Sequence, residues 1–129
     1  MAIRELTTKD FDATVDAPGI VLIDWWAPWC GPCRAFAPVY ERVAAANPDI
    51  VFTKVNTDEQ PELGSAYQIR SIPTLMMFRD GVLLFAQPGM LPAAGLTDLI
   101  EQARTVDMDM VRKKLAEELA DESGPNATH

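Results

Sequence analysis

The sequence predicts an α/β fold in which a central mixed β-sheet is flanked by helices. Apolar, β-branched segments alternate with segments of helical spacing in the order β-α-β-α-β-α-β-β-α. Strands separated by helices pair in parallel through right-handed crossovers, and Asp80-Gly81 is a hairpin signal that adds an antiparallel pair. The length of 129 residues and the apolar content of 48% fit one domain with a short appendage.

The chain begins with a weak strand and a short helix. The strand covers residues 2–6. We expect Thr7 or Thr8 to cap the helix, which runs to about Asp16, with Asp10 near the cap to satisfy free backbone N–H groups. A proline–glycine pair then ends the helix.

A buried strand and a long helix follow. Residues 20–26 form an apolar, β-branched run that is typical of a strand covered on both faces. After Cys33 a helical pattern continues to about Ala46, with apolar residues along one face. Pro38 lies inside this pattern and is expected to kink the helix.

The remaining elements of the domain are a strand, a short helix, a hairpin and a longer helix. The strand covers residues 50–56, and the short helix covers about residues 59–67. The hairpin strands are residues 73–79 and 82–87. A helix over residues 92–105, which a proline opens, completes the domain.

The composition changes after residue 106. We assign residues 1–106 to the domain and residues 107–129 to a C-terminal helical extension with a disordered tail from Asp121. An apolar stripe at helical spacing is formed by Met108, Val111, Leu115 and Leu119. We expect this stripe to fold back on the domain or to fray, and the alternative is a helix that associates with a partner or a second copy.

The charge balance excludes several classes of partner. With 11 basic and 19 acidic residues the chain has a net charge of −8, so we expect it to bind neither nucleic acid nor an anionic membrane. No apolar stretch is long enough to span a bilayer. The first ten residues carry no apolar signal region, and we therefore expect a cytoplasmic protein.

Few residues in this chain can carry out chemistry. The only histidine, His129, is the last residue, which disfavours Cys–His and Ser–His pairs and most metal sites. The sequence contains no glycine-rich phosphate-binding loop of either common type. We expect no bound metal. Two cysteines remain, and they lie three positions apart as Cys30-Gly31-Pro32-Cys33.

This cysteine motif lies between the buried strand and the long helix. A thiol at the first turn of a helix faces unpaired N–H groups, which favour the thiolate, so Cys30 is expected to be the attacking nucleophile. Cys33 lies nearly one turn further on, close enough to form a disulfide and to act as the resolving thiol. A structural disulfide or half a zinc site is the alternative. The lack of further cysteines disfavours it.

The motif and its surroundings resemble the thioredoxin family. Trp-Cys-Gly-Pro-Cys at residues 29–33 follows Ile-Asp-Trp-Trp-Ala at residues 23–27, and Ile-Pro-Thr at 72–74 and Pro-Gly at 88–89 come later. The resemblance covers residues 2–106. It implies the thioredoxin fold and dithiol exchange with protein disulfides. It also implies that a flavoprotein thioredoxin reductase reduces the protein with electrons from NADPH. We expect a monomer without bound cofactor.

The resemblance also assigns roles outside the motif. Asp24 matches the family's buried aspartate and is expected to accept the proton of Cys33 during its attack. Burial of a carboxylate in an apolar strand raises its pKa. Lys54, on the neighbouring strand, matches the lysine near that aspartate. The alternatives are an aspartate that only packs in the core and a lysine that only faces solvent.

A substrate groove is implied around the cysteines. Pro73 matches the family's cis proline, beside which the backbone pairs with the substrate chain, and Gly89 matches the opposite lip. On this resemblance the substrate-binding residues are Trp29, Gly31, Pro32, Ile72, Pro73 and Gly89. An exposed apolar patch at a reactive centre indicates a docking surface. For Trp29 the alternative is packing in the core.

Three functions remain in competition. A protein-disulfide reductase leads, because the Gly-Pro pair between the cysteines and Asp24 fit the thioredoxin pattern. A disulfide oxidant or isomerase is the nearest rival, but such relatives usually carry a histidine inside the motif, and this sequence has none. The third is a binding or holdase subunit that uses the apolar patch. It would need neither cysteine.

Overall fold

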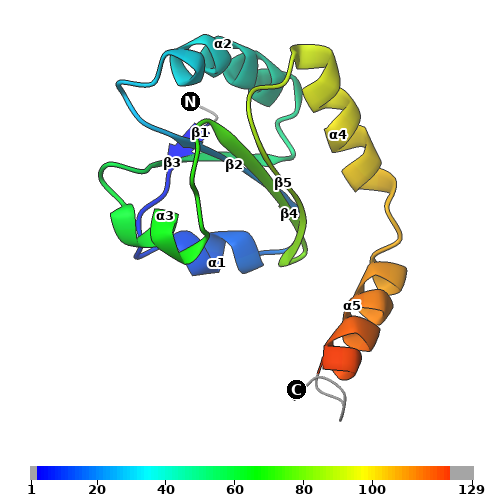
Figure 1. Cartoon of the computed structure of the whole chain (residues 1–129). Coiled ribbons are helices and arrows are strands. Elements are labelled where there is room, and N and C mark those ends of the chain that lie inside the picture. The colour runs from blue at the N-terminus through cyan, green and yellow to red at the C-terminus, as the bar shows by residue number, and fades with distance from the viewer. Residues whose placement is uncertain (1–2, 123–129) are drawn as a thin grey trace.

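The computed structural model describes residues 3–122, so most of the expected tail lies outside the described residues. This part of the chain alternates strands and helices as predicted, and ends in two consecutive helices (Figure 1). The elements are β1 (Ile3–Glu5), α1 (Phe11–Asp16), β2 (Ile20–Trp26), α2 (Gly31–Ala46), β3 (Val51–Asn56), α3 (Pro61–Ala66), β4 (Thr74–Arg79), β5 (Val82–Pro88), α4 (Ala93–Thr105) and α5 (Met108–Glu122).

The strands form one mixed sheet in the order β1-β3-β2-β4-β5. β1, β3 and β2 are parallel, whereas β4 and β5 are antiparallel to their neighbours. Helices α1 and α3 cover one face of the sheet, and α2 and α4 cover the other (Figure 1). The predicted α/β fold with a central mixed sheet and flanking helices is confirmed.

The central strand β2 divides its side chains between the two faces. Val21, Ile23 and Trp25 pack with α1 and α3, whereas Leu22 packs with α2 and α4. Successive residues of a strand point to opposite faces, so Asp24 lies on the Leu22 side. The only charged residue of this strand therefore faces α2, the helix that begins at the cysteine motif.

The cysteine motif forms the first turn of α2, as expected, because this helix begins at Gly31. The start of α1 differs from the sequence prediction. At α1 neither threonine is the cap. Asp10 occupies that position without a side-chain capping bond, and its Oδ1 accepts the Thr7 N–H at 2.7 Å. The Thr8 hydroxyl donates to Gln60 at 3.0 Å instead. Contacts made before the helix have thus replaced the expected capping bond.

The β4–β5 hairpin is closed by the predicted Asp80-Gly81 turn. Both residues have positive φ, 51° and 81°, as a type I′ turn requires. The Asp80 carboxylate accepts the Gly19 N–H at 2.8 Å, which ties the turn to the start of β2.

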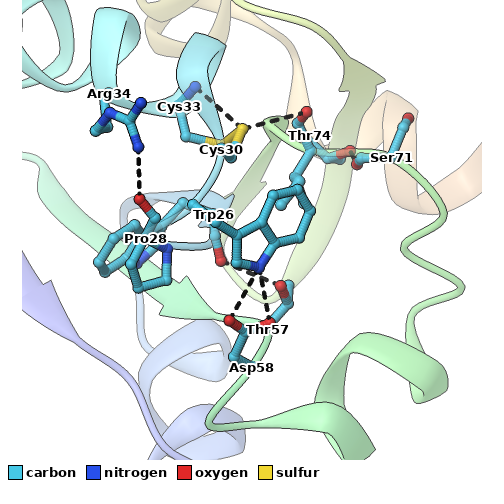
Figure 2. The surroundings of a disulfide bond; sticks show 11 residues. Trp26, Pro28, Cys30, Cys33, Arg34, Thr57, Asp58, Ser71 and Thr74 are labelled. Atoms are coloured by element: carbon cyan, nitrogen blue, oxygen red, sulfur yellow. Dashed lines mark hydrogen bonds between the residues drawn. A yellow bond between two sulfur atoms is a disulfide. The ribbon is translucent and has the colours of Figure 1, made fainter.

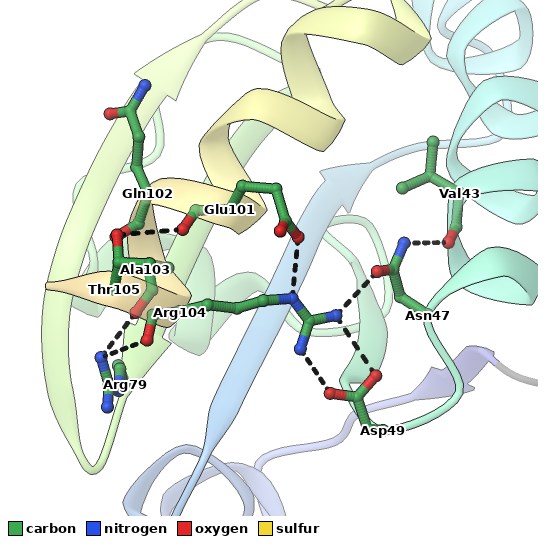
Figure 3. Close-up of polar contacts among 9 residues, drawn as sticks. All are labelled: Val43, Asn47, Asp49, Arg79, Glu101, Gln102, Ala103, Arg104 and Thr105. Carbon is green, nitrogen blue, oxygen red and sulfur yellow. Dashed lines mark hydrogen bonds and ion pairs between the residues drawn. The ribbon is translucent and has the colours of Figure 1, made fainter.

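Arginines fix the C-terminal end of α4, as Figure 3 shows. Arg79 donates to the carbonyl oxygens of Ala103 and Val106 at 2.7 and 2.9 Å, which satisfies carbonyls left free at the helix end. Arg104 pairs with Asp49 in the loop before β3, and this bond lowers the pKa of Asp49. These contacts hold α4 against the end of the sheet opposite the cysteines.

The extension forms α5, which packs on the domain only at its beginning. Met108 is 7% exposed, whereas Leu119 is 61% exposed. Arg112 lies 3.7 Å from Asp80. Val111 is half-buried, so the apolar stripe folds back on the domain over its first turn and faces solvent toward its end. The tail was expected from Asp121, but α5 continues to Glu122 because alanine, leucine and glutamate favour helix.

In the part of the chain that the structure describes, none of the helices has the length and apolar character needed to cross a membrane.

We predict that Met108 accounts for almost all of the stability that α5 contributes. Loss of the buried Met108 side chain should lower the free energy of unfolding by about 2 kcal/mol, because its apolar surface no longer leaves water on folding. The variant Met108→Ala and a chain ending at Val106 should therefore unfold at the same urea concentration. Leu119→Ala, the control, should unfold like the parent protein. A truncation that costs well over the Met108→Ala value would contradict this prediction.

Candidate active site

The cysteines form a disulfide at the first turn of α2 (Figure 2). Cys30 is the N-cap residue, and its Sγ accepts the backbone N–H of Cys33 at 3.2 Å. Both side chains are buried, with exposures of 4% and 2%. A sulfur atom at a helix N-cap faces free N–H groups and the positive end of the helix dipole, and both stabilise a thiolate. The geometry thus favours the reactivity expected of Cys30.

The loop before β4 lies beside the disulfide. Its Ile72–Pro73 peptide bond is cis, as the resemblance implied. The Ile72 carbonyl oxygen is 3.7 Å from Cys30 Sγ. Gly89 donates its N–H to the Pro73 oxygen at 2.7 Å, with a φ of 98° that favours glycine. The structure therefore brings Ile72, Pro73 and Gly89 together next to Cys30.

Trp29 forms an exposed wall beside the disulfide. The side chain is 67% exposed, so the alternative that it packs in the core is wrong. Its Nε1 donates to Asp58 Oδ2 at 3.0 Å, which orients the ring. Asp58 was not predicted as a site residue, because no local pattern joins two positions 29 residues apart.

A groove of about 390 Å³ runs along the wall that Trp29 forms. Its lining residues are Trp29, Thr57, Pro61, Gly64, Ser65, Ile69, Arg70, Ser71 and Ile72. Gly89 is not among these residues and lines a separate depression together with Met90. Gly31 and Pro32 are exposed at the start of α2. The six predicted substrate-binding residues thus surround Cys30 on several sides without sharing one pocket.

Asp24 is a buried carboxyl on the face that α2 covers. It is 1% exposed, and its Oδ1 has no hydrogen-bond partner among the described residues. Burial raises the pKa of Asp24 to about 7, although the positive charge of Lys54 lowers it. Burial, together with the charge of Asp24, also raises the pKa of Tyr40. A carboxyl that titrates near neutral pH is suited to accept and release protons.

Lys54 lies next to Asp24 on β3. The two residues are paired in register, and Lys54 is half-buried. Its ammonium lies 4.1 Å from the centroid of the Trp26 ring, a cation–π contact that holds the charge near this face.

The described residues contain no group of three or more histidine, cysteine or acidic side chains that could hold a metal ion. Arg34, which follows the motif, donates to the Pro28 oxygen at 2.9 Å and so fixes the loop before it (Figure 2).

Comparisons with known proteins place this arrangement among its relatives. The thioredoxin family model matches residues 2–102. A Streptomyces coelicolor protein named "Putative thioredoxin 2" is 61% identical over 116 residues, which are 90% of this chain and 87% of that protein. Thioredoxin from Staphylococcus aureus is 40% identical over 105 residues, which are 79% of this chain and 98% of that protein.

A solved structure shows the same fold. It comes from a study of thiol resolution in a yeast mitochondrial 1-Cys peroxiredoxin by the glutathione and thioredoxin systems. The TM-score is 0.72 at 27% identity, and the match covers 78% of this chain and 95% of the other.

We predict that Asp24 makes the oxidised protein less stable as the pH rises. The native state holds a proton that the unfolded chain releases, because the pKa rises from 3.8 to about 7 on folding. The free energy of unfolding should therefore fall between about pH 4 and pH 7, by a total of about 4 kcal/mol, and level off above pH 7. Urea unfolding of Asp24→Asn should lack this decrease, whereas the exposed control Asp98→Asn should keep it. An unchanged pH dependence in Asp24→Asn would contradict the assignment.

Proposed function

The chain belongs to the thioredoxin family and is a protein-disulfide reductase of the thioredoxin type, and from this premise we propose how its residues carry out the reaction. Cys30 is the attacking nucleophile and Cys33 the resolving thiol. The single observation that carries this order is the position of Cys30 at the N-cap of α2, where Cys33 N–H donates to its sulfur. Only the first cysteine receives this stabilisation as a thiolate.

The reaction exchanges one disulfide for another. The Cys30 thiolate attacks one sulfur of the substrate disulfide, which forms a mixed disulfide and releases a substrate thiolate. Cys33 then loses its proton and attacks the Cys30 sulfur. This step breaks the mixed disulfide, releases the second substrate thiolate and closes the Cys30–Cys33 bond. The substrate gains two electrons, the protein loses two, and the thiolates take up protons.

We assign the proton transfer to Asp24. Cys33 lies in the first turn of α2, and Asp24 lies on the β2 face that this helix covers. Its raised pKa lets it accept a proton near neutral pH. Lys54 favours the charged form of Asp24 and so keeps part of the carboxyl ready to act as a base.

The exposed surface around Cys30 is the proposed docking site for the substrate. Trp29 and Ile72 offer apolar contacts along the groove. The backbone beside Pro73 offers strand-like hydrogen bonds, and Gly89 on the other side leaves room for the substrate chain, because nothing lies within 4 Å of the position a side chain would take. Gly31 and Pro32 complete this surface at the start of α2.

The partners follow from the chemistry. A dithiol that is oxidised in each cycle needs an external reductant. We propose a flavoprotein thioredoxin reductase that draws on NADPH, with no cofactor bound to the chain itself. Thiols are kept reduced in the cytoplasm, where such a cycle can run, so we assign the protein to that compartment and expect it to act as a monomer.

We predict that Cys33→Ser traps substrates as covalent adducts. The variant keeps the nucleophile but cannot resolve the mixed disulfide, so adducts that disappear on reduction should accumulate in cell lysate and be visible by non-reducing electrophoresis. Cys30→Ser, the matched control, should trap nothing. Adducts on Cys30→Ser in place of Cys33→Ser would reverse the proposed order of attack.

We predict that Trp29→Ala weakens binding of protein disulfides. Loss of the exposed ring should raise KM for a protein disulfide roughly 5- to 10-fold, with little change for a small aromatic disulfide. The assay follows NADPH oxidation through thioredoxin reductase and therefore also requires the proposed partner. Met110→Ala, which removes an equally exposed side chain far from the disulfide, is the control. An unchanged KM in Trp29→Ala would contradict the docking surface.

A further inference from the structure

Three charged residues lie in one row across neighbouring strands. Glu5 of β1 is paired in register with Lys54 of β3, and Lys54 is in turn paired with Asp24 of β2. Residues paired in register in a parallel sheet point to the same face, and neighbouring strands are about 4.8 Å apart. Lys54 therefore lies between two carboxyl groups whose strands are roughly 10 Å apart.

This row connects the edge of the sheet with the centre of the site. Glu5 lies on the outermost strand and is exposed, Lys54 is half-buried, and Asp24 is fully buried. The Lys54 ammonium is held at 4.1 Å from the centroid of the Trp26 ring, and Trp26 follows Asp24 by two positions on the same face of β2. The single cation of the row is thus fixed where both carboxyl groups can interact with it.

We propose that Glu5 is a positioning residue of the redox site, whose carboxylate competes with Asp24 for the Lys54 ammonium and so sets how readily Asp24 accepts the proton of Cys33. This inference rests on the proposed role of Asp24 as proton acceptor. Glu5 acts through Lys54 and Asp24 and touches neither sulfur nor substrate.

The electrostatic effects have the signs that this competition requires. Burial raises the pKa of Asp24, Lys54 lowers it, and the negative charge of Glu5 raises it. Partial burial also raises the pKa of the largely exposed Glu5, and the positive charge of Lys54 again opposes this effect. Each carboxylate that attracts Lys54 leaves less of its positive charge for the other. A neutral residue at position 5 should therefore make Asp24 more acidic.

The other titratable groups around Asp24 are few. From α2, Tyr40 interacts with Asp24 and donates its hydroxyl to the Thr53 oxygen at 2.7 Å, and Cys33 lies in the first turn of the same helix. β4 contributes the apolar Leu75 in register with Asp24, and α4 contributes apolar residues to this face. Glu59 interacts with Glu5 and raises its pKa further. Only the edge strand β1 therefore brings a second carboxylate to the row.

The test is a direct titration of Asp24 in the full chain. The carboxyl carbon of Asp24 is followed by NMR against pH in the reduced protein. In Glu5→Gln its midpoint should move to lower pH by roughly 0.3 to 1 unit, the range expected for one charge at this separation and intermediate screening. Glu41→Gln removes the same charge from the exposed side of α2 and should leave the midpoint unchanged. Glu5→Asp, which keeps the charge, should have an Asp24 midpoint close to that of the parent protein.

Competition for Lys54 can be separated from simple repulsion between the two carboxylates. In a Lys54→Met background the cation is gone, so Glu5→Gln should move the Asp24 midpoint by less than half as much as in the parent. An equal shift in both backgrounds would overturn the competition. Equal midpoints in the parent, Glu5→Gln and Glu41→Gln would overturn the inference as a whole.

Turnover distinguishes this inference from the role of Asp24 on which it rests. The pH at half-maximal turnover of a protein disulfide should fall in Glu5→Gln by the same amount as the Asp24 midpoint, whereas Asp24→Asn should be slow at every pH near neutrality. If the Asp24 midpoint shifts in Glu5→Gln but Asp24→Asn turns over normally, the catalytic role of Asp24 is overturned and the coupling between Glu5 and Asp24 stands. If the Asp24 midpoint is unchanged in Glu5→Gln and Asp24→Asn is slow, only the coupling between Glu5 and Asp24 is overturned.

Discussion

The burial of a single carboxyl, Asp24, is the constraint to which the rest of the site is adapted. A charge in an apolar interior is costly unless another charge or a proton compensates it. Asp24 lies on the central strand, beneath α2, with one oxygen that has no partner among the described residues. Lys54 compensates it in part from the next strand. Because the compensation is incomplete, the carboxyl keeps a raised affinity for protons, and it does so directly below the helix that begins with the cysteines.

The disulfide depends on the same geometry. β2 ends at Trp26, and the chain crosses to the start of α2 within a few residues, so the first turn of the helix lies at the carboxyl end of the parallel strands. Sites in α/β sheets form at this end. Hydrogen bonds then fix the loops that connect these elements. Arg34 donates to the Pro28 oxygen, and the Gly89 N–H donates to the Pro73 oxygen beside Cys30. Rigid elements place the sulfur, and short loops shape the surface around it.

The sequence carried enough information for the sheet, the helix order and the reactive cysteines, because these depend on local periodicity and on one motif. It placed Asp24 and Lys54 on neighbouring strands for the same reason. It did not reveal the bond from Trp29 to Asp58 or the pair of Arg104 and Asp49, since these join positions 29 and 55 residues apart without a local signal. The predicted cap of α1 was wrong because tertiary contacts of Thr8 and Asp10 overrode the local preference for a threonine cap.

The role argued for Glu5 follows from strand register, which sequence patterns do not reveal for an edge strand of only three residues. A shift of β1 by one residue would turn Glu5 to the other face, where β2 presents Val21, Ile23 and Trp25 to an apolar core. On the α2 face the in-register row joins Glu5 to Lys54 and Lys54 to Asp24. The parallel register of three strands is therefore what lets a charge at the edge of the molecule act on a carboxyl at its centre.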